Sequence, residues 1–346
     1  MNVRQAIKVA ALTGGEHVPS ARFRVRQLIP ALSRYGVEMH EFIPSISKYP
    51  PELKWLRPFW GVAALAARVP AVLATHRYDV VFLQRELIST FLTLEPLAKR
   101  PRVLDVDDAI FLHRGGRFAK RLAQLSDLII CGNDFLAEHF SQWNKNITVI
   151  PTAIDTRRYT PRAQNRNSQD KLVIGWTGTS GNFKYLYQIE GALEKVIKTL
   201  PNVVFRVIAD KEPKFRGVPK ERFEFVQWSP ETEVPSVQTM TVGIMPLADT
   251  EWERGKCSYK MLQYMACGIP VVVSPVGMNA QVLSLGNVGF AAKSRDEWED
   301  ALLTMLSLDD REREKMGMVG RRIVEEHYSI DVMAPRLARK IKQLVS

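Results

Sequence analysis

Short runs of consecutive apolar residues alternate along the chain with longer segments whose apolar residues recur every three or four positions. The first pattern is typical of strands buried on both faces, and the second is typical of amphipathic helices. This alternation predicts parallel sheets covered by helices, which is an α/β architecture. The predicted strands are 7–12, 37–43, 80–83, 103–106, 128–131, 147–150, a strand from 172, 203–208, 223–226, 242–245, 271–273 and 289–291. Helices are predicted over 21–36, 133–143, about 183–200 and 329–345.

The segment TPRAQNRNSQDK, residues 160–171, interrupts this alternation. It is polar, contains a proline and has no periodicity, which indicates a linker. A chain of 346 residues also exceeds the usual size of one hydrophobic core. We therefore predict two doubly wound α/β halves, one on each side of this segment.

Composition and charge narrow the class of protein. The net charge of +11 fits either a well-solvated surface or an anionic partner, for which nucleic acid, an anionic membrane surface and a phosphorylated substrate all qualify. Three irregularly spaced cysteines are too few for a disulfide framework or a zinc site, which favours a reduced, intracellular setting. The sequence shows neither a signal-peptide pattern nor a run of about 18 apolar residues, so we expect no membrane span.

The segment WERGKCSYKMLQYMACGIPVVVSPVG, residues 252–277, holds the clearest candidate site. In doubly wound sheets, ligands bind outside the carboxyl ends of the strands. A helix that begins near Cys257 would present backbone N–H groups there, with Arg254 and Lys256 just before it. Ser274 and Gly277 follow the next strand in a loop of small residues that lets the backbone approach a phosphate. Together these features predict a diphosphate site.

On the helix of this segment, Lys260, Gln263 and Tyr264 share roughly one face. Tyr264 and the methionines have the composition of packing residues, because large apolar side chains are usually buried. Lys260 is either a solvated surface lysine or a further phosphate ligand, and we include it in the candidate site.

The order of these motifs resembles that of GT-B glycosyltransferases, particularly glycosyltransferase family four, also called group 1. Residues 260–274, KMLQYMACGIPVVVS, resemble the donor-nucleotide segment of that family. Residues 149–161 resemble its interdomain signature, residues 174–186 the first strand and turn of its nucleotide-binding domain, and residues 19–36 its first N-terminal helix.

The resemblance implies two Rossmann-like domains that face a central cleft. It also implies that the two domains close over the substrates to exclude water. It assigns residues 1–165 and a returning C-terminal helix, 330–346, to the acceptor side, and residues 166–329 to the nucleotide-sugar side. The implied activity is transfer of a sugar from a donor such as a UDP- or GDP-sugar to a glycan or lipid-linked acceptor, in cell-surface polysaccharide or glycolipid synthesis. Neither a cofactor nor a metal is implied.

The resemblance also implies roles for single residues. Lys184 matches the lysine that contacts the donor diphosphate, but Gly178 occupies the place of the expected arginine. We therefore predict that Arg254 or Lys256 supplies the missing charge. Gln263 stands where the family has a glutamate that holds the ribose, and an amide can form the same hydrogen bonds.

The family's other glutamate is also missing, because Gly255 occupies its place. We therefore predict that the nearby Glu253 contacts the sugar as a catalytic residue. Because the paired glutamates mark the retaining enzymes, the stereochemical outcome stays open.

In the N-terminal half, Asp105, Asp107 and Asp108 follow a strand where many relatives carry a catalytic histidine. Three interpretations stay open: a D-x-D metal motif as in the GT-A fold, hydrogen bonds within a loop, or a general base or charge stabiliser at the reaction centre. We take Asp107 and Asp108 as the catalytic candidates.

The first loop and helix of the N-terminal half supply candidates for the acceptor side. These are His17, Ser20 and Arg22. Arg24 cannot share a helical face with Arg22, so we expect at least one of the two arginines to serve structure or solvent.

Residues 49–79 combine prolines, aromatic residues and cations with an apolar helix-like run. This pattern fits either contact with an anionic membrane surface or an ordinary core helix. We therefore expect a cytoplasmic protein, with a peripheral place on the inner face of the membrane as one alternative. The rival functions are a nucleotide-sugar epimerase of the same fold and a nucleic-acid-binding protein; the latter is disfavoured because basic and aromatic residues are not interleaved on one strand or helix.

Overall fold

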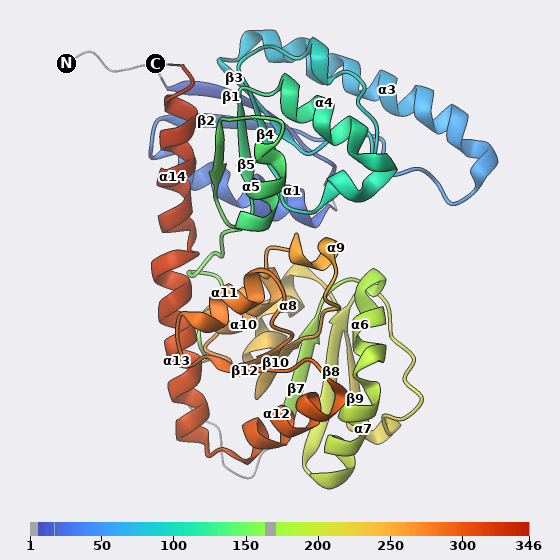
Figure 1. Ribbon diagram of the computed structural model, residues 1–346, viewed down its shortest axis with the longest axis vertical. Helices are drawn as coiled ribbons and strands as arrows, with labels where there is room; N and C mark the ends of the chain where they lie inside the picture. The colour runs from blue at the N-terminus through green and yellow to red at the C-terminus, as the bar shows by residue number, and fades with distance from the viewer. Residues whose placement is uncertain (1–5, 17, 163–170, 346) are drawn as a thin grey trace. The chain divides into compact units, whose positions relative to one another are not determined.

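The computed structural model of the protein describes residues 6–16, 18–162 and 171–345. The described chain forms two compact units, which are treated separately (Figure 1). The first unit comprises Met1–Ala153, Gly255–Cys257 and Ile330–Ser346, and the second comprises Ile154–Arg254 and Ser258–Ser329. Most of the predicted linker, residues 163–170, lies outside the described residues.

The first unit is built on a six-stranded parallel sheet with the order β2-β1-β3-β4-β5-β6. Its strands are β1 (Ile7–Leu12), β2 (Val37–Phe42), β3 (Val80–Gln84), β4 (Arg102–Val106), β5 (Leu128–Cys131) and β6 (Ile147–Val149). Its helices are α1 (Pro19–Arg24), α2 (Ile29–Ser33), α3 (Arg57–Ala74), α4 (Arg117–Leu125), α5 (Asp134–Ser141) and α14 (Ile330–Lys342). Helix α14 packs beside α2 and places Met333, Leu337 and Ile341 in the core of this unit.

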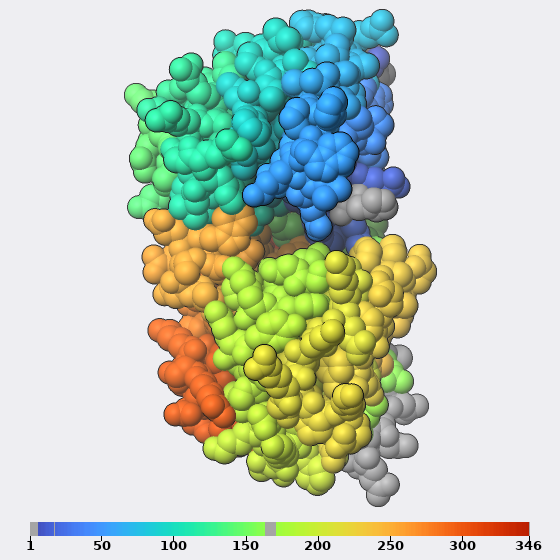
Figure 2. Space-filling model, turned by 90° about the vertical axis from the view of Figure 1, so that its right-hand side faces the viewer, coloured from blue at the N-terminus to red at the C-terminus, as the bar shows by residue number. Residues whose placement is uncertain are grey.

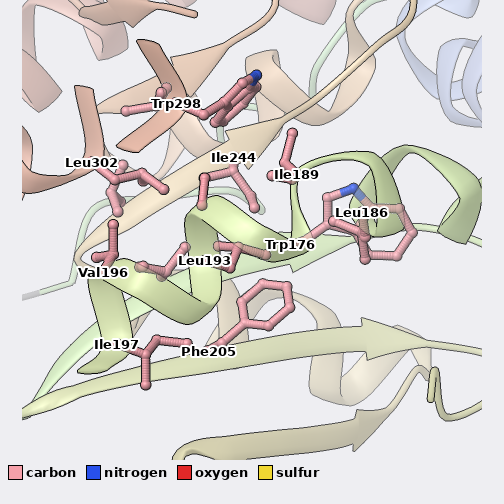
Figure 3. Close-up of a cluster of buried hydrophobic side chains, with 14 of the residues drawn as sticks. Trp176, Leu186, Ile189, Leu193, Val196, Ile197, Phe205, Ile244, Trp298 and Leu302 are labelled. Atoms are coloured by element: carbon pink, nitrogen blue, oxygen red, sulfur yellow. The ribbon is translucent and has the colours of Figure 1, made fainter. Parts of the chain in front are cut away.

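The second unit repeats this plan with the strand order β12-β11-β10-β7-β8-β9, again all parallel. Its strands are β7 (Leu172–Thr177), β8 (Val203–Ala209), β9 (Phe223–Gln227), β10 (Val242–Met245), β11 (Val271–Val273) and β12 (Gly289–Ala291). Its helices are α6 (Phe183–Gln188), α7 (Glu190–Thr199), α8 (Pro230–Gln238), α9 (Glu251–Arg254), α10 (Tyr259–Ala266), α11 (Met278–Ser284), α12 (Arg295–Ser307) and α13 (Asp310–His327). Figure 3 shows side chains of α7, β8 and α12, among them Leu193, Phe205 and Trp298, meeting in its core.

All twelve predicted strands are confirmed, because a β-branched run buried on both faces is a clear signal for a parallel sheet. Two of the predicted helices are wrong in extent. The helix predicted at about 183–200 is divided at Ile189. The N–H of Ile189 donates to the carbonyl of Leu186, three residues back, and this tight turn ends α6. Both α6 and α7 bury apolar residues. The segment 21–36 is also divided, and α2 begins next to Pro30, which has no N–H to donate within a helix.

One helix among the described residues, Lys54–Arg77, is long and apolar enough to cross a membrane by length and composition. The expectation of no membrane span was based on uninterrupted apolar runs, whereas this helix reaches the necessary apolarity although Arg57 and Arg68 interrupt it. That expectation stays a prediction, because length and composition alone do not show a membrane span.

Candidate donor-binding and catalytic sites

Each sheet has one position where successive connections leave in opposite directions. In the second unit this position lies between β7 and β10, and in the first unit it lies between β1 and β3. The loops that leave the carboxyl ends of these strands diverge, and the space outside them is where doubly wound sheets bind ligands.

In the second unit, Ser274 joins the loops that follow β10 and β11. Its hydroxyl accepts a hydrogen bond from the N–H of Leu247 at 3.0 Å, and its carbonyl accepts one from the amide of Asn279 at 3.0 Å. Ser274 and Asn279 are both buried. The two loops are thus held in one arrangement beside the carboxyl end of β10.

Gly277 ends the second of these loops with φ +54° and ψ −127°, a backbone conformation that favours glycine. A Cβ at this position would lie 2.7 Å from the carbonyl oxygen of Arg254. The glycine therefore lets the loop pack directly against the backbone of α9.

We expect Gly277→Ala to lower the free energy of unfolding by about 1 to 3 kcal/mol, because it adds both backbone strain and a steric overlap. Urea unfolding of the purified protein measures this. The matched control is Gly181→Ala, since a Cβ there meets nothing within 4 Å. Equal stabilities of the two variants would contradict the assignment.

Two lysines lie near the carboxyl end of β7. The ammonium of Lys260 is 5.7 Å from the ring centroid of Trp176, and the Lys260 Cε atom would be only 2.6 Å from a Cβ on Gly178. The stem of Lys260 therefore occupies the space that a side chain at position 178 would need, where the resembling family has its arginine. Lys184 lies in the first turn of α6 and leaves 62% of its side chain exposed, with Nζ 3.7 Å from Glu253.

Glu253 is buried, and both of its carboxylate oxygens accept hydrogen bonds. The donors are the hydroxyls of Tyr185 and Thr250. Burial opposes ionisation, but these hydrogen bonds outweigh it and lower the pKa of Glu253. Contact with the sugar stays a prediction for this residue, whereas the structure shows that it joins α9 to α6. Sequence reasoning missed Tyr185 and Thr250, because nothing in the spacing connects them to position 253.

The remaining predicted donor residues have protein partners. The amide nitrogen of Gln263 donates to the hydroxyl of Tyr159 at 2.9 Å and to Glu233 at 3.0 Å, in a buried network. Its contact with a ribose stays a prediction. Arg254 pairs with Asp249 at 2.8 Å on the surface.

Lys256 belongs to the short segment that is grouped with the first unit. Its carbonyl accepts a hydrogen bond from the amide of Asn133 at 3.0 Å, and the thiol of Cys257 donates to the carbonyl of Asp107 at 3.3 Å. A Cβ on Gly255 would lie 2.9 Å from the backbone nitrogen of Ala109. This close approach explains why position 255 holds no glutamate.

In the first unit, Arg24 and Asp105 form a buried ion pair. Arg24 also donates to the carbonyl of Ile150 at 2.7 Å, so it is a structural residue. The expectation that one of the two arginines of α1 serves structure is confirmed. Both oxygens of Asp105 accept from Arg24, so its carboxylate is already paired. Asp107 and Asp108 follow the end of β4 at Val106.

Two of the predicted acceptor-side residues, Ser20 and Arg22, lie on α1. Ser20 is half-buried, and the guanidinium of Arg22 lies 4.9 Å from the ring centroid of Phe23. His17 lies outside the described residues. The roles of Ser20 and Arg22 in acceptor binding stay predictions.

A buried cluster of charges lies at the carboxyl ends of β3 and β4. Arg85, which has a positive φ of 63°, donates to Asp108 at 2.8 Å and lies 3.6 Å from Asp107. On its other side, Glu86 accepts a hydrogen bond at 3.2 Å from Lys48, whose side chain is buried. Burial raises the pKa of Asp108, although Arg85 opposes this. A residue held in a sparsely populated conformation among buried charges is typical of a functional site.

Four residues of this region carry buried side-chain atoms without a hydrogen-bond partner. These atoms are both amide atoms of Gln84, Nε of Arg85, one oxygen of Glu86 and Oδ1 of Asp107. Three of these atoms still lie near an opposite charge, since Nε of Arg85 is 4.0 Å from Glu86 and Oδ1 of Asp107 is 3.6 Å from Arg85. The cluster is thus held by charge and keeps hydrogen-bonding capacity that its own members do not use. Sequence reasoning missed Lys48, Gln84, Arg85 and Glu86; the available signal was the polar run Gln-Arg-Glu directly after a buried strand.

The Lys48–Glu86 pair should make stability depend on pH. Burial and the charge of Arg85 lower the pKa of Lys48 to about 8, although Glu86 opposes this. In the unfolded chain Lys48 keeps its proton to higher pH than it does in the folded protein. The free energy of unfolding therefore rises as pH increases through 8. Between pH 7 and 9 we expect a gain of roughly 1 kcal/mol in the free energy of unfolding. Urea titrations of the wild type and of Lys48→Met/Glu86→Leu measure it, and the prediction requires the difference between them to change with pH.

The described part of the chain contains no group of three or more His, Cys, Asp or Glu side chains that could hold a metal ion.

Two parallel six-stranded sheets, each covered by helices, match the GT-B fold of solved glycosyltransferase structures. Residues 171–308, which form most of the second unit, match the family described as "Glycosyl transferases group 1". The second unit thus carries a group 1 glycosyltransferase domain, and the predictions of the GT-B fold, of a resemblance to group 1 and of a transferase are confirmed.

Solved structures agree on the fold. The Anabaena protein HepE in complex with UDP and glucose superposes with a TM-score of 0.70 at 15% identity, over 98% of this chain and 100% of that one. Sucrose-phosphate synthase from Thermosynechococcus elongatus gives 0.70 at 16% identity over 98% and 99%. A trehalose-6-phosphate structure from E. coli bound with UDP-2-fluoro glucose gives 0.68 at 12% identity over 98% and 99%. A comparison of the sequence with curated proteins gives no match.

Proposed function

We propose that the protein transfers a sugar from a nucleoside-diphosphate sugar to a hydroxyl of a glycan or a lipid-linked acceptor. The observation that carries the proposal is the pair Lys184 and Lys260 near the carboxyl end of β7, at the switch point of the sheet. Two cations beside a turn with little side-chain bulk suit a diphosphate, which becomes more negative as the sugar departs. UDP is the first nucleotide to test, because two of the solved relatives, HepE and the E. coli protein, are described with UDP or a UDP-sugar.

In this proposal the cluster at the carboxyl ends of β3 and β4 serves the acceptor. Asp107 has an oxygen without a hydrogen-bond partner, whereas Asp108 accepts from Arg85. Asp107 is therefore the better placed of the two to accept the proton of an attacking hydroxyl or to stabilise the positive charge of an oxocarbenium-like transition state. Arg85, Lys48 and Glu86 act as positioning residues that hold the two aspartates.

A thermal-shift screen tests the nucleotide part of the proposal, because selective binding to the folded state raises the melting temperature. We expect UDP or another nucleoside diphosphate to stabilise the protein more than the corresponding monophosphate does. A screen in which no nucleotide raises the melting temperature would contradict the proposal. Incubation with the stabilising nucleotide-sugar alone then separates the rival activity, since an epimerase yields an isomerised donor without any acceptor.

The cellular setting is also part of the proposal. A role in cell-surface polysaccharide or glycolipid synthesis would place the protein in the cytoplasm, where nucleotide-sugars are used, with its acceptor at the inner face of the membrane. The net charge of +11 and the exposed residues of α3 support this setting. Cell fractionation with a tagged chain measures it.

A further inference from the structure

Helix α3 of the first unit exposes an apolar face. The exposed positions from 59 onward follow helical spacing, and every one of them is apolar: Phe59, Val62, Ala63, Ala66, Val69, Pro70 and Leu73. Phe59, Val62 and Leu73 leave 72%, 71% and 63% of their surfaces exposed. Trp55, in the turn before the helix, is 68% exposed. We call Trp55 together with these seven residues the apolar face of α3.

The opposite face of α3 is fixed to the first unit. Ala64, Arg68 and Val72, each four residues apart, are buried, and Arg68 donates to the carbonyl of Thr13 at 2.7 Å. The indole of Trp60 donates to the carbonyl of Ser47 at 2.9 Å, which ties the start of the helix to the preceding loop. A helix whose middle is held in this way cannot insert lengthwise into a bilayer. The helix instead presents its apolar face as a rigid strip. Figure 2 shows the segment before α3 and the start of α3, in blue, at the surface of the first unit.

Cations flank the apolar face, and acidic residues are absent from residues 53–78. Lys54 and Arg57 are exposed at its start, and Arg77 is exposed just beyond its end. This arrangement complements an anionic membrane surface, where apolar side chains enter the acyl boundary and cations meet the headgroups. A second copy packed antiparallel on the same strip would bring Lys54 and Arg57 near Arg77, so that like charges would oppose the contact.

We infer that the apolar face of α3, with Lys54, Arg57 and Arg77, docks the protein on an anionic lipid bilayer with the helix parallel to the membrane plane. This inference goes beyond the proposed sugar transfer and does not depend on it, since the apolar face and its cations contain none of the residues of either candidate site. The ligand is the bilayer surface itself rather than a single lipid.

Co-sedimentation with vesicles tests the inference. The full chain should sediment with phosphatidylcholine vesicles that contain phosphatidylglycerol at low salt, and much less with pure phosphatidylcholine or at high salt. Phe59→Ser/Val62→Ser should lower the partition coefficient at least about tenfold. The matched control, Leu285→Ser/Met318→Ser, removes two exposed apolar residues of the second unit and should bind as the wild type does.

Charge variants and fluorescence complete the test. Lys54→Glu/Arg57→Glu should also lower binding about tenfold, whereas Arg311→Glu/Lys315→Glu, which reverses two charges on α13, should change it little. Tryptophan emission should shift to the blue on binding, and Trp55→Phe should reduce that shift while sedimentation persists. The inference is overturned if the wild type fails to bind anionic vesicles at low salt, if Phe59→Ser/Val62→Ser binds as well as its control, or if these residues instead support a dimer.

The same variants separate this inference from the proposed function. Phe59→Ser/Val62→Ser should keep the thermal shift that a nucleoside diphosphate produces in the wild type. If the variant loses vesicle binding but keeps its nucleotide response, the apolar face acts in membrane binding and not in nucleotide binding. If the wild type shows no nucleotide response, only the proposed sugar transfer is contradicted.

Discussion

Replacing Asp107 with asparagine is expected to lower kcat by about 10²- to 10⁴-fold while leaving the affinity for the donor nucleotide unchanged. The substitution keeps the size of the side chain but removes the charge that the proposed reaction uses. Asp107 carries a buried oxygen without a hydrogen-bond partner at the carboxyl end of β4. Steady-state rates at saturating donor, together with calorimetric titration of the nucleotide, measure the two quantities separately.

Asp108→Asn is the matched comparison. Asp108 accepts a hydrogen bond from Arg85 at 2.8 Å, and an amide oxygen can still accept it. We therefore expect a smaller loss, about tenfold in kcat. If Asp107→Asn retained the wild-type rate, or if Asp108→Asn were the more damaged of the two, the role assigned to Asp107 would be wrong.

Replacing Lys260 with methionine should lower kcat/KM by about 10²- to 10³-fold and weaken nucleoside-diphosphate binding. Methionine retains much of the aliphatic stem that lies against Gly178 and Trp176 but removes the positive charge. The charge matters most when the diphosphate leaves, so the loss should appear in turnover as well as in binding.

Three further lysine variants give this prediction its controls. Lys184→Met removes the lysine that the family resemblance assigns to the diphosphate and should produce a loss of similar size. Lys315→Met changes an exposed lysine of α13 and should be neutral. If Lys256→Met abolished nucleotide binding while Lys260→Met did not, the missing charge would come from Lys256, as the sequence analysis predicted.

The strands were predictable because a parallel sheet covered on both faces needs uninterrupted apolar runs, and each run ends where polar loop residues begin. The helices were less predictable. Periodicity alone continues through Ile189, yet the chain makes a tight turn there. The turn depends on how residues on both sides of it pack on the sheet, which is a tertiary effect.

In the candidate sites, too, some features could be predicted from the sequence and others could not. Ser274 and Gly277 were proposed because loops after strands can be located in the sequence, whereas Lys260 came from the pattern of the next helix and Lys184 from the family resemblance. The contacts of Glu253 with Tyr185, and of Lys48 with Glu86, join residues 68 and 38 positions apart. Sequence spacing carries no information about such pairs, because their distance is set by the order of strands in each sheet.

The sequence by itself determined the α/β class, the strands, the family resemblance and the loops that border the candidate nucleotide site, since each of these depends on residues close together in the chain. Only the tertiary structure decided which polar residues are already paired, which cation stands beside Gly178, and which face of α3 is exposed. These properties arise when distant segments pack together, because packing sets both the partners of a charge and the water that it loses.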